Sequence, residues 1–261
     1  MYSYEHVLYL KKKRTTKVLI TMTQILIIVL FLSLWQILAD KELINTFILS
    51  SPKNVTKTII NLYNTNNLWI HIWTTTYETL ISFTLGTLIG FIIASILWKF
   101  PFIAKVLDPY LTILNSLPKV ALGPIIIIWA GASMKSIIIM ALLISVIITI
   151  INIYQAFTEI DPLKIKLLKS LGATTNQVYF KLILPGSIST IINTLKINIS
   201  MSLIGVIMGE LLISKAGLGY LIMYGSQVFN LNLVITGIFL LCLLATTMYY
   251  LLVYIEKVHT K

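Results

Sequence analysis

Long apolar segments dominate the pattern of hydrophobic and polar positions along this chain. Residues 18–39, 79–98 and 136–158 contain no charged side chain, and each segment has about the 20 residues that a helix needs to cross roughly 30 Å of hydrocarbon. The pattern therefore predicts an all-α, polytopic membrane protein with six transmembrane helices. We place the six spans near residues 18–39, 74–98, 118–133, 135–157, 187–212 and 231–255.

The third span is the weakest of the six. Only 15 uncharged residues separate Lys119 from Lys135, and Pro124 interrupts them. The segment predicts a short or broken helix, or the end of a helix that begins near Pro109. Backbone that is not helical at that depth must be buried in protein or line a cavity, because lipid cannot satisfy its polar groups.

Charged residues are few and unevenly distributed. The chain is 57% hydrophobic and 11% charged, and its net charge is +11. With the N-terminus inside, 14 of the 20 Lys and Arg residues fall on the cytoplasmic side and five on the outer side, the asymmetry that orients membrane proteins. The positive charge therefore indicates orientation and not nucleic-acid binding. Residues 1–17 and 256–261 are predicted to be cytoplasmic ends of one membrane domain, residues 18–255.

The first apolar segment follows a basic stretch, Lys11–Arg14. A signal peptide begins in a similar way, but its apolar core is shorter and a small-residue cleavage site follows it. We therefore expect residues 18–39 to remain as a helix. The single cysteine, Cys242, permits no internal disulfide and no cysteine-rich metal site.

A capped, polar element interrupts the apolar pattern between the fourth and fifth spans, at residues 161–185. Asp161 is a suitable N-cap, and Pro162 suits the first helical position. Apolar residues then recur at every fourth position, which predicts a short amphipathic helix, and Gly172 can adopt the left-handed conformation that ends it. The apolar positions are Leu163, Leu167 and Leu171, widened by Ile165 and Leu168.

A second helix is predicted directly after Gly172. The segment Thr174–Gln177 has the spacing of a capping box, in which the side chain of each end residue binds the backbone of the other. Leu184-Pro185-Gly186 is expected to stop this helix. Two capped helices joined at a glycine predict a stiff projection on the cytoplasmic side.

The 161–185 element resembles the cytoplasmic "EAA" loop of binding-protein-dependent ABC importer permeases. Gly172 and the ending Leu182-Ile183-Leu184-Pro185 fit the family pattern, whereas Lys166-Leu167-Leu168 stands where the family has Glu-Ala-Ala. Further segments resemble such permeases, and in particular their nitrate, sulfonate and taurine branch, over roughly residues 70–255. These segments are Asn115–Pro124 with Trp129–Gly131, Gly205–Glu210 and Ala216–Ile222.

The resemblance implies a type I ABC importer permease in a bacterial cell membrane. It implies a homodimer that binds two cytosolic ATP-binding subunits and is served by an external solute-binding protein. The chain has no Gly-x-x-x-x-Gly-Lys-Ser/Thr loop, so we expect ATP and Mg to be bound by the partner ATPase, and this chain to hold no cofactor and to be no enzyme. The residues expected to couple it to the ATPase are Lys164, Lys166, Leu167, Leu168, Gly172, Ala173, Leu184 and Pro185. The alternative is that this helix lies flat on the membrane, with its lysines facing lipid phosphates.

Acidic residues occur in or beside two spans. An acid in the membrane is costly, so Glu210 is a candidate for the transport pathway; alternatively it is interfacial and either paired with Lys215 or capped by backbone. We expect Glu78 at the membrane interface and Lys196 in a structural role. The candidate pathway or gate residues are Glu210, Gly217, Gly219 and Tyr220.

Small residues recur at every fourth position of the second span, at Gly86, Gly90 and Ala94. This spacing lets two membrane helices approach closely. We therefore expect this face to pack against another helix and not to contact the substrate.

Two other classes of protein are less consistent with the sequence. An ion-coupled secondary carrier commonly has broken helices in corresponding halves and several buried ionisable groups, whereas only Glu210 is a plausible example here. A membrane-embedded enzyme would need a cluster of His, Asp and Glu, which the sequence does not indicate. For an ABC permease, the branch resemblance favours a small anion such as a sulfonate, taurine or nitrate, and a pyrimidine precursor of thiamine is the alternative substrate.

Overall fold

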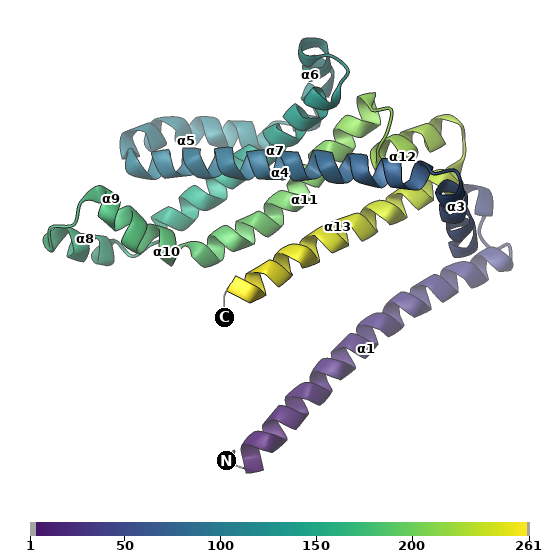
Figure 1. Ribbon diagram of the computed structural model, residues 1–261, viewed down its shortest axis with the longest axis horizontal. Coiled ribbons are helices and arrows are strands. Elements are labelled where there is room, and N and C mark those ends of the chain that lie inside the picture. The colour runs from purple at the N-terminus through teal and green to yellow at the C-terminus, as the bar shows by residue number, and fades with distance from the viewer. Residues whose placement is uncertain (1–3, 260–261) are drawn as a thin grey trace.

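The computed structural model describes residues 4–259, with side chains for residues 11–257, and all regular structure in that range is helical (Figure 1). Two short elements differ from the α-helix: η1 is a 3-10 helix and η2 is a π-helix. The elements are α1 (Tyr4–Asp40), α2 (Thr46–Leu49), α3 (Pro52–Asn64), α4 (Asn67–Lys99), α5 (Pro101–Ser116), η1 (Lys119–Leu122), α6 (Gly123–Ala130), α7 (Met134–Thr158), α8 (Pro162–Ser170), α9 (Thr175–Val178), η2 (Tyr179–Ile183), α10 (Leu184–Gly186), α11 (Ile188–Ile213), α12 (Leu218–Gln227) and α13 (Leu231–His259).

Five of the described helices are long and apolar enough to cross a membrane: α1, α4, α7, α11 and α13. A sixth candidate span is a bent pair, in which α5 and the η1–α6 segment meet at 85°. The predicted all-helical membrane fold is therefore confirmed.

The predicted third span, residues 118–133, contains only the short η1–α6 segment, which a break separates from α5. Leu117 has ψ 138°, an extended conformation that the following proline, Pro118, imposes on the residue before it. The chain turns there, so that α5 lies along α4 while α6 points away from it (Figure 1). The prediction of a short or broken helix is confirmed, whereas the alternative of one continuous helix from Pro109 is wrong.

The core of the fold is formed by α4, α7 and α11, and α7 makes the most extensive contacts, with α4 on one side and α11 on the other. Glycines allow this close approach. A Cβ atom on Gly90 of α4 would lie 2.6 Å from Cβ of Thr149 in α7, and one on Gly209 of α11 would lie 2.9 Å from Cγ2 of Ile137. Ala94, one turn after Gly90, is fully buried. The predicted packing role of the Gly86, Gly90 and Ala94 face is confirmed.

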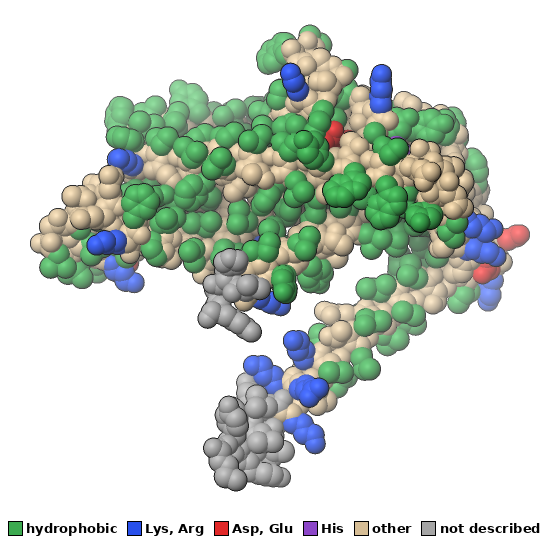
Figure 2. Space-filling view, viewed as in Figure 1, with side chains coloured by type: hydrophobic (Ala, Val, Ile, Leu, Met, Phe, Trp, Pro, Cys, Tyr) green, Lys and Arg blue, Asp and Glu red, His purple; other side chains and the backbone are tan. Residues whose placement is uncertain are grey.

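Helix α1 lies apart from this core (Figure 1). None of its most apolar window is buried, although its length and hydropathy are those of a span. Its connection to the rest of the chain is near its C-terminal end, where Gln36 Oε1 accepts a hydrogen bond of 3.0 Å from the backbone N of Lys53 in α3. The rest of the described chain therefore leaves the apolar side chains of α1 exposed (Figure 2).

Replacing Gly90 with leucine tests the close packing of the core. The added side chain would collide with Thr149, and overpacking of this kind costs about 1–3 kcal/mol of unfolding free energy. We expect a lower thermal unfolding midpoint for Gly90→Leu in detergent. Thr84→Leu, at an exposed position of the same helix, is the control and should leave the midpoint unchanged; equal midpoints for both variants would contradict the packing described.

Candidate functional site

The 161–185 element begins as the sequence predicts. Asp161 Oδ1 accepts a hydrogen bond of 2.8 Å from the backbone N of Leu163, and Pro162 occupies the first turn of α8. Gly172 follows α8 with φ +83°, a left-handed conformation in which a residue with a Cβ is strained. The backbone therefore reverses at Gly172, and the two short helices of the element lie at one end of the molecule (Figure 1).

The second half of the element begins with the predicted capping box. The side chain of Thr174 accepts from the backbone N of Gln177 at 3.3 Å, and Gln177 Oε1 accepts from the backbone N of Thr174 at 2.8 Å. The backbone N–H groups of Thr174 and Gln177, which have no partner within the helix, are satisfied in this way. The predicted capping box is therefore confirmed.

The predicted stop at Leu184-Pro185-Gly186 is wrong. The chain stays helical through α9, η2 and α10, and α11 begins at Ile188 after the single residue Ser187. A proline inside an α-helix has no N–H to donate and clashes with the carbonyl four residues earlier. The π-helical turn directly before Leu184 widens the helix at that point, which lets the chain pass Pro185 without ending.

A cluster of buried apolar side chains fixes the element to the membrane helices. Val178 and Ile183 from the element are fully buried against three residues of α4 and α7. Ser187 adds a hydrogen bond of 3.0 Å from its hydroxyl to the backbone oxygen of Ala156 in α7. We call this cluster the apolar joint, and it consists of Ala94, Ile153, Phe157, Val178 and Ile183.

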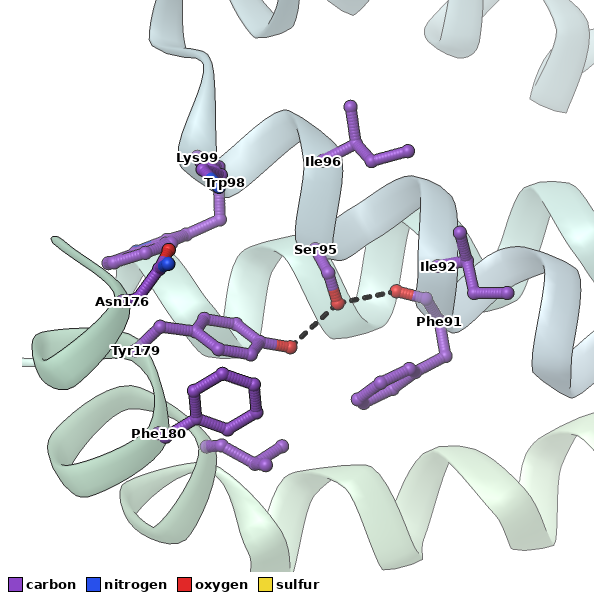
Figure 3. A pocket seen from close by; sticks show the side chains of 10 residues that line it. Phe91, Ile92, Ser95, Ile96, Trp98, Lys99, Asn176, Tyr179 and Phe180 are labelled. Carbon is purple, nitrogen blue, oxygen red and sulfur yellow. Dashed lines mark hydrogen bonds between the residues drawn. The ribbon is translucent and has the colours of Figure 1, made fainter.

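A groove lies beside the apolar joint, between the end of α4 and the α9–η2 segment (Figure 3). Its volume is about 440 Å³ and its walls are mostly apolar. The hydroxyl groups of Tyr179 and Ser95 are 2.7 Å apart in a hydrogen bond, and Ser95 also donates to the backbone oxygen of Phe91 at 2.7 Å. This polar contact ties the element directly to α4.

The predicted coupling residues divide into two groups. Lys164, Lys166 and Leu167 are exposed on α8, and Leu167 is 61% exposed between Leu163 and Leu171, which are also exposed. Pro185 and Gly172 are exposed as well. In contrast, Leu168 and Ala173 pack against the apolar joint and Leu184 lines the groove, so these three side chains support the element from within.

The second candidate site surrounds Glu210 near the opposite end of α4 and α11. Glu210 is 1% exposed and accepts two hydrogen bonds of 2.6 Å, from the Thr75 hydroxyl to Oε1 and from the backbone N of Gly219 to Oε2. The hydroxyl oxygen of Thr75 accepts in turn from the backbone N of Leu218 at 2.8 Å. The backbone N of Gly217 donates to Nδ1 of His71 at 3.0 Å.

Three successive backbone N–H groups, those of residues 217–219, are therefore held by buried side chains of α4 and α11. Gly217 has φ +110°, and a Cβ atom there would collide with the Glu210 carboxylate. Tyr220 follows and stacks on the ring of His71, with ring centroids 5.8 Å apart. We call this group the Glu210 cluster; it consists of His71, Thr75, Glu78, Glu210, residues 217–219 and Tyr220. The structure thus brings together all four predicted pathway or gate residues.

The expectation that Glu78 lies at the membrane interface is wrong. Glu78 is 3% exposed and lies one turn after Thr75, whose hydroxyl donates to Glu210. It is buried because it follows Thr75 on the face of α4 that packs against α11. Of the two partners considered for Glu210, Lys215 is exposed, whereas the backbone N of Gly219 donates to the Glu210 carboxylate.

Sequence reasoning missed the contribution of α4 to this cluster. His71, Thr75, Glu78 and Ser82 recur at spacings of four, three and four, which places them on one face of an apolar helix. A polar stripe on an apolar helix is the signal that would have indicated a buried polar contact. Among the described residues, no group of three or more His, Cys, Asp or Glu is arranged to hold a metal ion.

Lys196 has the structural role that the sequence predicts. Its Nζ atom forms an ion pair of 2.6 Å with Glu256 in α13 and lies 3.3 Å from Oδ1 of Asn193. The pair joins α11 to α13, and it satisfies the charge of Lys196 within the chain.

Comparison with known proteins relates this chain to a family of membrane transport components. Residues 86–258 match the family described as binding-protein-dependent transport system inner membrane component. The chain is 27% identical to a probable ABC transporter permease protein of Haemophilus influenzae, over 87% of this chain and 91% of that protein. It is 25% identical to the putative aliphatic sulfonates transport permease protein SsuC of Bacillus subtilis, over 83% and 79% of the two chains.

A solved structure shares the fold. A chain of the inward-facing MetNI methionine ABC transporter aligns with a TM-score of 0.65 and 19% identity, over 74% of this chain and 98% of that chain. The family match covers more than half of the sequence, and the chain therefore belongs to the binding-protein-dependent transport system inner membrane component family. It is a multi-pass transmembrane permease subunit of an ABC importer, and the ATPase of such an importer is a separate subunit.

Replacing Thr75 with valine tests the Glu210 cluster. The variant removes the donor to Glu210 and the acceptor of the Leu218 N–H, and each buried polar group left unpaired costs about 1–3 kcal/mol. We expect a lower thermal unfolding midpoint for Thr75→Val. The matched control is Thr74→Val, because the hydroxyl of Thr74 donates only within its own helix, to the Ile70 oxygen. A midpoint for Thr75→Val that equals the control would contradict the assigned hydrogen bonds.

Proposed function

We propose that the 161–185 element is the coupling element of this permease, through which a cytosolic ATPase moves the membrane helices. The observation that carries the proposal is a short capped helix that is apolar and exposed on one side and fixed to the core on the other. Leu163, Leu167 and Leu171 are 71%, 61% and 75% exposed. A partner surface would remove these three side chains from water and so stabilise the complex.

The charge of α8 suits an acidic partner. Lys164, Lys166 and Lys169 are exposed beside the leucines, and none of them forms an ion pair among the described residues. Acidic side chains around a groove on the ATPase would complement them. Lipid phosphates would also attract these lysines, and loss of ATPase binding in a leucine variant of α8 separates docking on the ATPase from docking on lipid.

The apolar joint explains how docking would move the spans. Val178 and Ile183 are fully buried against α4 and α7, so a displacement of the element displaces the ends of these helices with it. Close-packed interiors transmit displacement because they have no free volume to absorb it. ATP-driven closure of the partner would therefore rock α4, α7 and α11 and expose a central path alternately to each side of the membrane.

The Glu210 cluster has a second proposed role, which is to hold the start of α12 in place. Each of its hydrogen bonds is made within the chain, to a backbone group or to another member of the cluster. Gly217, Gly219 and Tyr220 then form one fixed segment beside the transport path, and Glu210 supports that segment. We therefore propose a gate that moves as a unit with α4 and α11.

The assembly that we propose contains two copies of this chain, two ATP-binding subunits and an external solute-binding protein, with both termini and the coupling element on the cytoplasmic side. ATP and Mg would bind to the ATPase subunits. A small anion is the proposed substrate, and the similarity to the SsuC permease supports a sulfonate. Uptake of a labelled aliphatic sulfonate, compared with uptake of a pyrimidine precursor of thiamine, separates this substrate from the alternative.

Replacing Leu167 with aspartate tests the docking surface. Burying one leucine contributes about 1.5–3 kcal/mol, and a loss of that size weakens binding at least about tenfold. We expect Leu167→Asp to lose co-purification with its ATPase and ATP-driven uptake into proteoliposomes. The control is Leu43→Asp, at an equally exposed leucine outside the element. Uptake that is driven by an ion gradient without the ATPase would identify a secondary carrier and contradict the proposal.

Replacing Gly172 with proline tests the shape of the element. Proline fixes φ near −65°, whereas Gly172 has φ +83°, so the turn between α8 and α9 cannot form. We expect the Gly172→Pro permease to reach the membrane in normal amount, because this residue lies outside the core, and to lose ATP-driven transport. Gly172→Ala, which the left-handed conformation strains by about 1–2 kcal/mol, should retain part of the activity. Normal transport by Gly172→Pro would rule out the coupling role.

A further inference from the structure

Two carboxyl groups, those of Glu78 and Glu210, are buried where α4 packs against α11. Glu78 in α4 is 3% exposed and Glu210 in α11 is 1% exposed, and Glu78 lies one turn after Thr75, whose hydroxyl donates to Glu210. Acidic side chains buried this close together are rare in a protein interior, because two bare carboxylates repel each other and both lose their hydration. This arrangement therefore needs a source of stabilisation.

The two carboxyl groups have different hydrogen bonds. Both oxygens of Glu210 accept, Oε1 from the Thr75 hydroxyl and Oε2 from the backbone N of Gly219, each at 2.6 Å. This is the environment of an ionised carboxylate. Glu78 has a buried oxygen, Oε2, with no hydrogen-bond partner among the described residues. A proton on Glu78 would give this oxygen a donor role toward Glu210.

Among the described side chains, no cation is paired with Glu78 or Glu210 to balance their negative charge in place of a proton. His71, on α4, accepts a hydrogen bond at Nδ1 from the backbone N of Gly217, so its ring is neutral in this arrangement. Tyr220 of α12 stacks on that ring. Lys135 at the start of α7 and Lys215 before α12 are both exposed.

We propose that Glu78 and Glu210 share a single proton, and that protonated Glu78 acts as a positioning residue that completes the hold on residues 217–219. Glu78 donates its O–H to Glu210, Glu210 binds Thr75 and Gly219, and Thr75 binds Leu218. The proton is taken from solvent when the segment docks against α4 and returns to solvent if the segment opens. The inference goes beyond the proposed function, because it does not depend on the ATPase or on the transported solute.

Infrared spectroscopy of the reconstituted permease tests the shared proton directly. Protonated carboxyl groups have a C=O stretching band that ionised ones lack, and labelling glutamate carboxyls with ¹³C separates this band from those of lipid esters. We expect the wild-type protein at neutral pH to have such a band and Glu78→Gln to lose it. Glu42→Gln, at an exposed position, is the control and should retain it. Absence of the band from the wild-type protein would overturn the proposal, whether or not the variants fold.

The pH dependence of stability distinguishes a protonated Glu78 from a merely structural one. The folded protein would hold one more proton than the unfolded chain at neutral pH, so its stability falls as pH rises. Glutamine donates from its amide as the acid donates from its hydroxyl, so Glu78→Gln should unfold within about 2 °C of wild type at about pH 6 and lose less stability than wild type toward about pH 9.

Alanine provides the matched comparison for glutamine at this position. Glu78→Ala has no donor and should unfold at a lower temperature than Glu78→Gln at both pH values. Equal midpoints for the two variants would contradict the inference, because they would mean that the donor on residue 78 contributes nothing. The same slope of stability with pH in wild type and Glu78→Gln would also overturn it.

Discussion

The apolar joint is the contact on which the rest of this account depends. Val178 and Ile183 lie without exposed surface against Ala94, Ile153 and Phe157, at the end of the molecule where the 161–185 element projects. Without this joint, the two short helices would be a surface loop attached by its two ends. With it, the element becomes an extension of α4 and α7, so that a force on the exposed leucines acts on the membrane helices.

The core has polar interactions at one end and the apolar joint at the other, and α4 takes part in both. Near its start, α4 contributes Thr75 and Glu78 to the Glu210 cluster; near its end, it contributes Ala94 to the joint and Ser95 to the contact with Tyr179. The close approach of α4, α7 and α11 at glycine positions joins these two sites. By contrast, α1 and α6 have few contacts with this core, which leaves them available to lipid or to another chain.

The parts of the fold that local chemistry determines could be predicted from the sequence. The lengths of the apolar segments predict the spans, and Asp161, Gly172 and the Thr174–Gln177 capping box predict the helix boundaries of the element, because caps and left-handed turns depend on only a few adjacent residues. The third span was expected to be short or broken from its length and from Pro124, but the break lies at Pro118, and Pro124 is in the first turn of α6. The continued helix past Pro185 could not be predicted in this way, because a π-turn compensates for the proline there.

The Glu210 cluster could be predicted only in part. Glu210, Gly217, Gly219 and Tyr220 are near one another in sequence, and all four were recognised as candidates. Their partners on α4 are more than 130 residues away, as the separation of 135 between Thr75 and Glu210 illustrates. The polar stripe on α4 indicates that one face is buried, but it does not identify the helix that covers it. That pairing depends on the tertiary packing of α4 against α11.

A distance measurement between two spin labels tests most directly whether the element and the core move as one body. Thr175 on the element and Leu88 on α4 are both exposed, and Thr175 lies outside the leucine surface that docks on the ATPase, so labels at these positions should disturb neither the packing nor the docking. In the complete transporter, with labelled chains diluted by unlabelled ones, the account predicts the same Thr175–Leu88 distance with and without ATP, while distances between the two copies change. A change of the Thr175–Leu88 distance upon ATP binding would mean that the element moves independently of α4, and would contradict the account.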